Sequence, residues 1–367
     1  MLVLAACTSE ALIIPSPTNV RLTATPNHAL PRPAMPLTRV QSEHRLAFAD
    51  KLASGLYRLE DAAVCLCGAT DAVDLADHDR FGLPVGTVLC RECGLARTTP
   101  RLASKNLPAF YEHDYHGLHL DVRDPDPDHA MFRRGQGAAI HAFLVDLLAS
   151  GPLRIADIGA GAGQVMQEFE GAHDGPVFGV GCEYSSEFVE AGQRAGRDLR
   201  HGGPEQITGD APFDLVILSH VVEHFPDPVR DLTAVRALGH RHTLFYVEVP
   251  GLLTIDRKPE YAYRLDQYLT VAHTFHFTRA TLAATMARAG FAEVRADENI
   301  HAVFRTAPVA IPARDPDHAA VVMASIARLS TWPVRSRSAL RQARQRLAAT
   351  AKSMLPGRVV RAIRRRR

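Results

Sequence analysis

The sequence has no long apolar run. Hydrophobic residues make up 46% of the 367 positions, but no stretch approaches the ~20 consecutive apolar residues that a membrane-spanning helix needs. This pattern predicts a chain without such a helix. The apolar content is ordinary for a folded protein, and the length predicts two or more domains.

Acidic residues are absent from the last 50 positions. Between His318 and Arg367 there are 13 lysines and arginines and no aspartate or glutamate. The rest of the chain holds the other 29 of the 42 basic residues against all 40 acidic ones, a net charge of −11. We therefore predict an acidic body followed by a basic helical tail, residues 313–367. A thin apolar stripe in this tail is formed by Leu340, Ala343, Leu347, Ala351 and Met354.

Three interpretations of the tail stay open. The stripe and the four terminal arginines suit peripheral contact with an anionic membrane surface. The same charge could bind nucleic acid, or it could be a solvated charge run that binds nothing. We favour the membrane surface, because the rest of the sequence has no basic cluster suited to binding nucleic acid.

Basic residues are also absent from the N-terminus. The opening MLVLAAC places Leu-Ala-Ala before Cys7, as a lipoprotein signal does. However, no basic residue precedes Cys7, and the apolar stretch is too short for a signal of ~7–15 apolar residues. The next residues, to about Thr38, are rich in proline, threonine and alanine and show no periodicity. We predict that residues 1–45 are a disordered extension or follow a start assigned too early.

The sequence RIADIGAGAGQ, residues 154–164, organises the chain. Residues 155–158 predict a short buried strand, and the apolar residues after Gln164 recur at helical spacing. Between them, Gly159, Gly161 and Gly163 predict a turn that lets a ligand approach the backbone closely. The helix that follows would present free N–H groups to that ligand.

Further strands follow at regular spacing. Residues 176–181 predict a second strand, and Glu183 at its end could accept both hydroxyls of a ribose. A short run around Leu199 is the candidate for a third strand, and residues 213–218 and 242–251 predict a fourth and a fifth. Residues 276–291 predict a helix capped by Thr278 and ended by Gly290, with two last strands after it.

The pattern G-x-G-x-G, with Asp157 two residues before it, resembles motif I of class I S-adenosylmethionine (SAM)-dependent methyltransferases. It does not match the dinucleotide motif G-x-G-x-x-G, because Gln164 stands at the third glycine. The resemblance covers residues 128–307. It implies an α/β fold, a Rossmann-like doubly wound sheet of seven strands, in a domain spanning residues 126–312, with SAM as the cofactor. It implies cofactor binding by Asp157, Gly159, Gly161, Gly163, Glu183 and Ser219.

Cysteines are few, yet four of the six stand in two close pairs, Cys65 and Cys67, then Cys90 and Cys93. The second pair reads C-x-x-C-G, as in a zinc ribbon, and the first is one residue tighter. Four thiolates would close a tetrahedral site, so the predicted Zn²⁺ is structural. Two disulfides or unliganded thiols are the alternatives, and disulfides are unusual in the cytosol.

This cysteine module, residues 46–125, resembles the N-terminal zinc-binding module of sugar and polysaccharide-biosynthesis methyltransferases. The resemblance implies that the module covers the substrate side of the SAM site. Tyr111 and Tyr115 lie four residues apart within NLPAFYEHDYHG and could reach a ligand from one helix face. They could equally be core aromatics.

Methyl transfer to a hydroxyl or a carbon acid needs a group that accepts a proton. The sulfonium of SAM supplies the electrophile, so no catalytic metal is required. We expect the base just beyond the fourth strand, where His220, Glu223 and His224 stand. On a helical turn His220 and His224 would share a face, and histidine titrates near neutral pH.

Two alternatives to this catalytic prediction stay open. Glu223 could orient an imidazole or bind a sugar hydroxyl, or the acid–histidine pair could only support the loop. His273 and His276 are the second candidates for the base, although His276 could instead cap or pack.

The sequence therefore predicts a cytoplasmic SAM-dependent methyltransferase, which at most touches the inner membrane surface with its tail. Its acceptor would be a small or lipid-linked sugar or a glycan-linked intermediate, methylated at oxygen. Alternatives are C-methylation of a nucleotide-linked keto-sugar, a protein that binds or methylates nucleic acid, and an inactive SAM-binding scaffold. The loop between the cysteine pairs is acidic and would repel phosphates, which disfavours nucleic acid.

Overall fold

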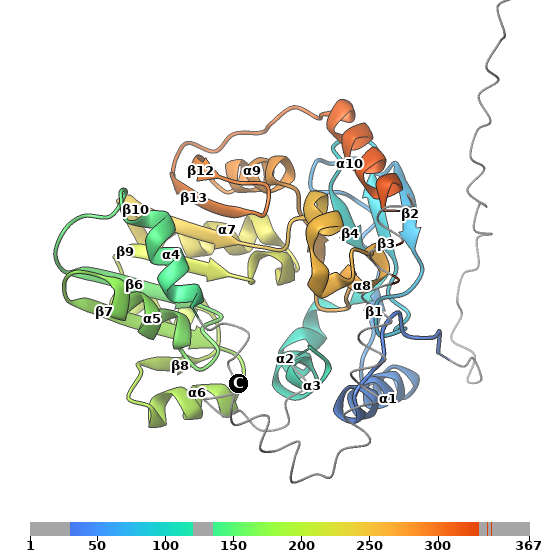
Figure 1. The fold of residues 1–367 in the computed structure, drawn as a ribbon, viewed down its shortest axis with the longest axis horizontal. Coiled ribbons are helices and arrows are strands. Elements are labelled where there is room, and N and C mark those ends of the chain that lie inside the picture. Colours follow the sequence, from blue (N-terminus) through green and yellow to red (C-terminus); the bar gives the residue numbers. More distant parts are fainter. Residues whose placement is uncertain (1–29, 120–134, 330–335, 337–338, 340–367) are drawn as a thin grey trace, which may run out of the picture.

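The computed structural model describes residues 30–119 and 135–329, together with residues 336 and 339. Figure 1 shows two bodies side by side, a large sheet with its helices and a smaller body from the N-terminal part of the chain. The apolar stripe and terminal arginines predicted for the tail lie outside the described residues. Within the described residues, no helix is long and apolar enough to cross a membrane.

The larger body is built on a seven-stranded sheet with the order β12-β13-β10-β9-β6-β7-β8. Strands β10, β9, β6, β7 and β8 run parallel to one another, whereas β13 is antiparallel to both β10 and β12. This mixed α/β sheet confirms the predicted doubly wound fold and all the predicted strands. The strands are β6 (Leu153–Ile158), β7 (Val177–Glu183), β8 (Leu199–His201), β9 (Phe213–Ser219), β10 (Gly239–Glu248), β12 (Phe291–Ala296) and β13 (His301–Thr306).

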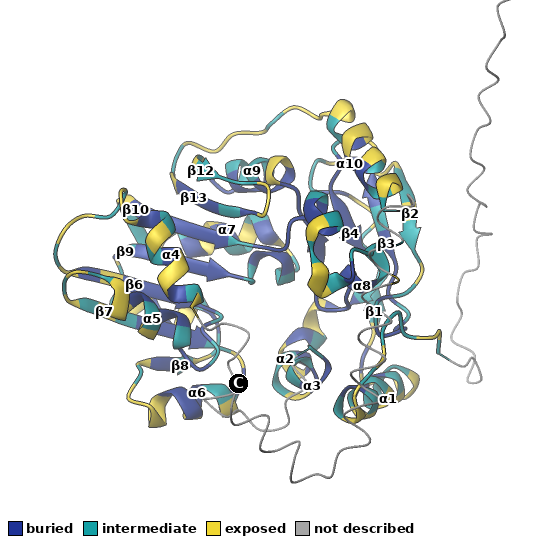
Figure 2. Ribbon diagram, in the orientation of Figure 1, coloured by how far each residue is buried: buried dark blue, intermediate teal, exposed yellow. Residues whose placement is uncertain are grey.

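Helices cover both faces of this sheet, and its strands are buried between them (Figure 2). On one face α4 and α5 pack through Ile140 and Phe169, and on the other α7 and α9 pack through Leu232 and Met286. The helix α9 confirms the prediction, since Thr278 caps it with a reciprocal pair of hydrogen bonds. The helices are α4 (Gln136–Leu144), α5 (Gln164–Ala172), α6 (Ser186–Arg194), α7 (Pro228–Arg236) and α9 (Arg279–Arg288).

The smaller body contains a four-stranded sheet with the order β11-β4-β3-β2. The edge strand β11 comes from the segment after β10, so the module is completed by residues from the middle of the chain. Apolar side chains of that segment, including Tyr268 and Leu269, share a core with Leu89 and Ala96. The strands are β2 (Ala72–Ala76), β3 (Thr87–Cys90), β4 (Ala96–Thr98) and β11 (Phe275–His276), with a separate pair β1 (Leu59–Glu60) and β5 (Arg101–Leu102).

Helices at both ends of the described chain pack on this smaller body. Helix α1 starts within the predicted N-terminal extension and buries Phe48 completely. Helix α10 starts within the predicted tail and buries Val322 against the module. The packed part therefore begins before residue 45 and continues past residue 313. The helices of this body are α1 (Arg39–Ala53), α2 (Leu107–His113), α3 (Tyr115–His119), α8 (Leu265–Tyr268) and α10 (Pro316–Arg328).

Candidate functional site

The glycine turn between β6 and α5 has a left-handed backbone. Gly159, Gly161 and Gly163 have φ angles of 68°, 56° and 79°, which glycine adopts at little cost. A Cβ on Gly159 would lie 2.7 Å from Val221, whereas one on Gly161 would meet only Phe188, at 3.9 Å. Gly161 is therefore open to the space in front of the turn, where a ligand can lie against the backbone.

Glu183 ends β7 beside this turn. Its Oε2 accepts a hydrogen bond from the backbone N–H of Gly161 at 3.0 Å, and its Oε1 accepts one from Ser185 at 3.0 Å. Each carboxylate oxygen can accept a second donor. The carboxylate is thus fixed by the backbone and can still accept the hydroxyls of a ribose.

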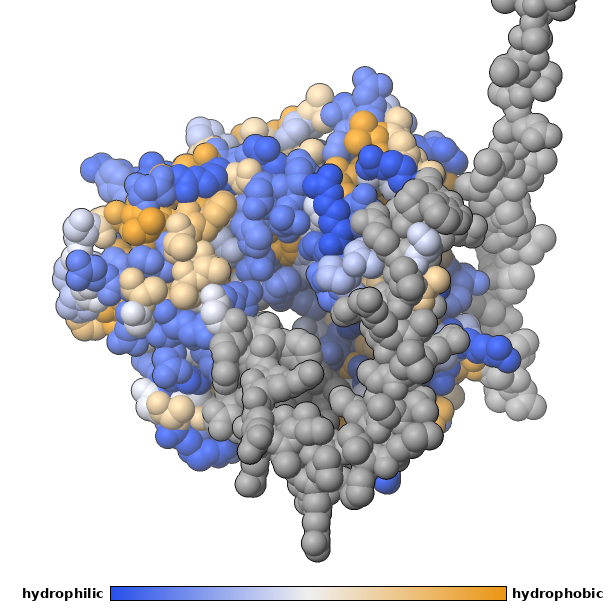
Figure 3. Space-filling model, in the orientation of Figure 1, coloured by the Kyte–Doolittle hydropathy of each residue, from blue (hydrophilic) through white to orange (hydrophobic). Residues whose placement is uncertain are grey.

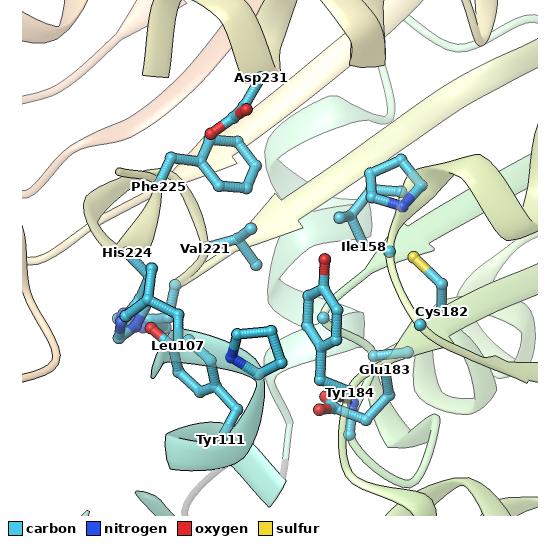
Figure 4. A pocket seen from close by; sticks show the side chains of 18 of the residues that line it. Leu107, Tyr111, Ile158, Cys182, Glu183, Tyr184, Val221, His224, Phe225 and Asp231 are labelled. Atoms are coloured by element: carbon cyan, nitrogen blue, oxygen red, sulfur yellow. Dashed lines mark hydrogen bonds between the residues drawn. The ribbon is translucent and has the colours of Figure 1, made fainter. Parts of the chain in front are cut away.

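A cavity of about 490 Å³ lies between the glycine turn and the N-terminal body, within the range of small-molecule sites. Gly161 and Glu183 line one wall, and Leu107 and Tyr111 of α2 line the wall opposite (Figure 4). In Figure 3 the surface is hollowed between the two bodies. The module therefore supplies part of the same cavity as the glycine turn.

Contacts between α2–α3 and α6 hold this second wall in place. Glu112 accepts hydrogen bonds from the backbone N–H of Ser186, at 3.3 Å, and from its hydroxyl. The ring of His116 stacks on Phe188 with centroids 4.2 Å apart. Since both rings line the cavity, the joint between the two bodies is itself part of the site.

The structure brings only some of the predicted residues to the cavity. Asp157 and Ser219 are each 1% exposed. The Ser219 hydroxyl donates to Glu248 at 3.1 Å and accepts from the Gln136 amide at 2.7 Å. Ser219 thus lies behind the cavity wall rather than in it. The predicted residues that line the cavity are Gly159, Gly161, Glu183, His220 and His224, and those behind the wall are Asp157, Gly163, Ser219 and Glu223.

His220 and His224 do not share a helical turn, so that part of the prediction is wrong. His220 has a left-handed backbone with φ of 57°, and the short 3₁₀ helix begins after it, at Val222. The N–H of His220 donates to the carbonyl of Glu248 at 2.8 Å, at the end of the neighbouring strand β10. Both imidazoles nevertheless line the cavity.

His220 lies between two carboxylates. Its Nδ1 is 3.4 Å from Oε1 of Glu223, and its Nε2 is 3.5 Å from Oε1 of Glu248. Burial disfavours the charged imidazole, but the two carboxylates outweigh burial and raise the pKa of His220 to about 9. At neutral pH His220 is therefore a cation and has no lone pair for a proton.

Sequence reasoning missed Glu248, although a signal for it existed. It ends β10 as Glu183 ends β7, and the carboxyl ends of parallel strands meet at one edge of a sheet. Burial opposes its ionisation, yet the neighbouring His220 lowers the pKa of Glu248 to about 2. A carboxylate at that strand end was as visible in the sequence as Glu183.

His224 is held by different partners. Its Nδ1 lies 2.9 Å from the carbonyl oxygen of Ala272, and a carbonyl can only accept, so Nδ1 carries the proton. In the neutral ring the lone pair is then on Nε2, which lies 3.9 Å from Oε1 of Glu223. Both carboxylate oxygens of Glu223 are buried without a hydrogen bond among the described residues.

The second candidates lie behind His224. The His273 ring packs edge-on against it at 5.0 Å, and burial holds the pKa of His273 well below its usual value. His276 is in β11 with Nε2 3.3 Å from the Thr98 hydroxyl, and burial lowers the pKa of His276 to about 3. Neither imidazole lines the cavity.

Tyr111 and Tyr115 line the cavity and also belong to a packed layer of rings. Both rings approach His224 edge-on, with centroids 5.8 and 5.7 Å away. The Tyr111 hydroxyl is buried without a hydrogen bond among the described residues. The two open interpretations are thus compatible, because each ring packs on one side and faces the cavity on the other.

The sulfurs of the four cysteines lie close together, although the first and the last cysteine are 28 positions apart in the chain. Cys65 and Cys93 have sulfurs 3.6 Å apart, and those of Cys67 and Cys90 are 3.7 Å apart. Disulfides need ~2.05 Å, so these pairs are not bonded. A tetrahedral Zn²⁺ with ~2.3 Å bonds sets its sulfurs ~3.8 Å apart, which fits.

Both cysteine pairs end in a turn closed by a glycine. Each pair is followed by a glycine in the left-handed region, Gly68 with φ of 83° and Gly94 with φ of 73°. The N–H of Gly68 binds the carbonyl of Cys65 at 2.8 Å, and that of Gly94 binds Cys90 at 3.0 Å. The tighter spacing therefore does not prevent a four-sulfur site.

The raised pKa of His220 makes the stability of the fold depend on pH. The imidazole is protonated in the folded state up to about pH 9, but only up to ~6.5 in the unfolded chain. The stabilisation that protonated His220 gives to the folded state is therefore complete below pH ~6.5 and is lost as the pH rises toward 9. Urea unfolding at pH 6, 7.5 and 9.5 should show this decline in the wild type and a smaller one in His220→Gln. The exposed His242→Gln should behave as the wild type; an unchanged pH profile in His220→Gln would contradict the assignment.

Comparison with known proteins decides the class of the larger body. Residues 128–296 match the sequence family described as a methyltransferase domain. That stretch contains the glycine turn, Glu183 and the histidines of the cavity, and its sheet has the strand order given above. The larger body therefore contains a methyltransferase domain. No match is found among curated proteins.

Several solved methyltransferase structures resemble the chain weakly. The complex of the Haloferax volcanii Trm112 methyltransferase activator with the putative methyltransferase is 18% identical, with a TM-score of 0.37 over 47% of this chain and 75% of that one. The Burkholderia thailandensis 1,6-didemethyltoxoflavin-N1-methyltransferase is 18% identical, with a TM-score of 0.36 over 62% and 95%. The Synechocystis magnesium protoporphyrin IX methyltransferase is 12% identical, with a TM-score of 0.36 over 56% and 96%.

Proposed function

We propose that this methyltransferase transfers the methyl group of SAM to a hydroxyl of a sugar or a glycan-linked intermediate. The observation that carries the proposal is the position of His224. Its imidazole lines the cavity between the glycine turn and the tyrosines of the module. A group that can accept a proton therefore stands between the cofactor end and the end that remains for an acceptor.

His224 is the proposed general base. The hydrogen bond from Nδ1 to the Ala272 carbonyl keeps the lone pair on Nε2. Once Nε2 accepts the acceptor's proton, the imidazolium would be stabilised by the carboxylate of Glu223, 3.9 Å away. The same carboxylate oxygen also lies 3.4 Å from Nδ1 of His220, so Glu223 faces both imidazoles. The proposed roles are thus His224 as base, Glu223 as its stabilising partner, and His220 as a cation that Glu223 and Glu248 hold in place.

The cofactor subsite is proposed at the glycine turn and Glu183. When bound, SAM supplies a methyl group on a positively charged sulfur. The open backbone at Gly161 leaves room for it, and Glu183 can accept from its ribose hydroxyls.

Glu183→Ala should weaken SAM binding by ~1–3 kcal/mol, because a charged hydrogen-bond acceptor is lost. Titration calorimetry measures this directly. Glu187→Ala, an exposed acid on the same loop-helix unit, is the matched control and should bind as the wild type. Wild-type protein that binds NADH but not SAM would refute the cofactor assignment.

The acceptor end favours a hydroxyl-rich ring. The phenols of Tyr111 and Tyr115 offer flat apolar faces together with donor and acceptor oxygens. A sugar presents both kinds of surface. C-methylation of a keto-sugar is the second candidate, because the His220 cation could stabilise the enolate oxygen that this reaction forms.

A structural Zn²⁺ is proposed at the four cysteines, where it would tie the loop before β2 to the end of β3. All four ligand positions would be occupied by sulfur, so the metal would have no open position for a substrate. Its contribution would be to hold the module, and with it α2 and α3, against the cavity.

Labelled methyl transfer tests the proposed acceptor. Purified protein, [methyl-³H]SAM and separate sets of free sugars, sugar nucleotides, lipid-linked sugars and RNA should give label in a sugar-containing set only. NMR of the product then distinguishes a new O-methyl group from a C-methyl group. Label in RNA alone would exclude the sugar proposal, and would give the basic tail a nucleic-acid role in place of the membrane contact proposed for it.

A further inference from the structure

A second group of metal-ligating side chains lies at the cavity, apart from the four cysteines. Within the described residues it consists of Glu223, His224 and His273, whose ligand atoms all lie within 4.8 Å of one another. His224 lines the cavity, and His273 packs edge-on behind it with the ring centroids 5.0 Å apart. Two imidazole nitrogens and a carboxylate are the donor set of known zinc sites with three protein ligands. The group therefore has the composition of a metal site.

Glu223 and His273 each bring buried polar atoms to this group. The Glu223 side chain is 1% exposed, and neither of its carboxylate oxygens makes a hydrogen bond within the described part of the chain. Oε1 faces the imidazoles of His220 and His224, which leaves Oε2 for a further partner. Nδ1 of His273 is likewise buried without a hydrogen bond to a described residue. Such atoms cost free energy unless a ligand satisfies them.

His224 has the orientation of a metal ligand. Its Nδ1 donates to the Ala272 carbonyl oxygen at 2.9 Å, so Nε2 carries the lone pair of the neutral ring. A histidine that binds a metal almost always donates its other ring N–H to a carbonyl, a carboxylate or a water. Nε2 lies 3.9 Å from Oε1 of Glu223. The lone pair and the carboxylate are therefore within reach of one ion.

The backbone holds the parts of the group together. The N–H and the hydroxyl of Thr274 donate to the carbonyl of Glu223 at 2.8 and 2.9 Å, and Ala272 accepts from His224. The residues before and after His273 are thus both bound to the other two members. A tetrahedral Zn²⁺ with ~2.0–2.1 Å bonds sets such ligand atoms ~3.4 Å apart, so side-chain movements of ~1 Å would complete the site.

We propose that Glu223, His224 and His273 bind a divalent transition metal, with Zn²⁺ as the type, and that this metal inhibits methyl transfer. The site is weaker than the one at the cysteines, because two neutral imidazoles and one carboxylate replace four thiolates. Imidazole suits Zn²⁺, whereas Mg²⁺ and Ca²⁺ take oxygen ligands. The inhibition rests on the proposed function, since a metal on Nε2 takes the lone pair with which His224 would accept the acceptor's proton.

Titration calorimetry tests the site without methyl transfer. Protein that holds zinc at the cysteines is titrated with Zn²⁺ and, separately, with Mg²⁺. The wild type should bind one further Zn²⁺ per chain at micromolar concentration and no Mg²⁺. His273→Gln should weaken this second Zn²⁺ by more than the ~10-fold that the loss of an outer partner of a metal ligand costs. His242→Gln changes an exposed imidazole that packs against His240; it should bind as the wild type does, which controls for zinc on surface histidines.

Two further measurements keep the test decisive if His273→Gln does not fold. Glu223→Gln retains the shape of the side chain and removes its charge, so it should also weaken the second Zn²⁺ while elemental analysis still finds the zinc of the cysteines. Co²⁺ needs no variant. When it is added to the zinc-loaded wild type, it should give the visible spectrum of nitrogen and oxygen ligands, without the sulfur-to-metal charge-transfer band of a cysteine site.

Inhibition is measured with the acceptor that the labelling experiment identifies. Wild-type turnover should fall as the second site fills, and His273→Gln should need more Zn²⁺ for the same loss. Zn²⁺ that fills the site and leaves turnover unchanged, or raises it, would overturn the inhibition and the role of His224 as base.

The site itself fails if the wild type takes up no Zn²⁺ beyond that of the cysteines, or if His273→Gln and Glu223→Gln both bind the second Zn²⁺ as tightly as the wild type. SAM affinity measured in the same samples separates this failure from that of the proposed function. If SAM binds and the second Zn²⁺ does not, only the metal site falls. If SAM does not bind the wild type, the proposed function falls, and the metal site is judged by Zn²⁺ binding alone.

Discussion

Cys90→Ser should release zinc and leave the N-terminal module unfolded. Structural zinc sites contribute ~10–16 kcal/mol of binding free energy in isolated peptides, which is as large as the whole ~5–15 kcal/mol stability of a typical domain. The cysteine is completely buried in the main apolar core, where Leu95 and Phe275 also pack. Without the metal, three thiols and a hydroxyl would remain in that core with few partners.

Elemental analysis should find one zinc per wild-type chain and none in Cys90→Ser. Circular dichroism and size exclusion should show lost structure and aggregation in the variant. Cys182→Ala is the control, because this buried cysteine in β7 lies outside the four-sulfur cluster. A metal-free wild type of normal stability would remove zinc from the account and leave four unliganded thiols.

His224→Ala should lower turnover by ~10²–10⁴-fold, the usual contribution of a general base. SAM affinity should stay near the wild-type value, because the predicted cofactor subsite is formed by the glycine turn and Glu183. Turnover measured against pH should lose its dependence on a group that must be deprotonated. Turnover is measured with the acceptor that the labelling experiment identifies, and SAM affinity is measured by titration calorimetry.

His220→Gln separates the two histidines. If His220 is a cation, turnover in His220→Gln should fall less than in His224→Ala. The pH profile of the variant should still show a group that must be deprotonated. The reverse order of effects would make His220 the base. Equal losses of turnover and SAM affinity in His224→Ala would instead mean that the imidazole only supports its loop.

The sequence was sufficient for the larger sheet because its signals are local. Alternating apolar runs, a glycine turn after residues 155–158, and Thr278 before a helix each depend on a few neighbouring residues. Glu183 was found for the same reason, as an acid at a strand end. The grouping of the cysteines was visible too, since they stand in two close pairs, each followed by a glycine.

What the sequence could not show is how segments far apart in the chain meet. It gave no sign that β11 would complete the module's sheet, or that α10 would bury Val322 there. These contacts join residues more than 150 positions apart, and no spacing within either segment records them. For the same reason the packed body extends at both ends beyond the boundaries predicted at residues 45 and 313.

The protonation of the site was decided by tertiary structure alone. In sequence, His220 and His224 are two histidines four residues apart, equally suited to accept a proton. In the fold, the left-handed backbone at His220 puts one imidazole between Glu223 and Glu248, and the Ala272 carbonyl fixes the tautomer of the other. The sequence determined the residue types, the strands and the glycine turn, because these follow from local preferences. The fold decided that His220 lies between two carboxylates, and its pKa is raised because those groups are brought together from separate segments.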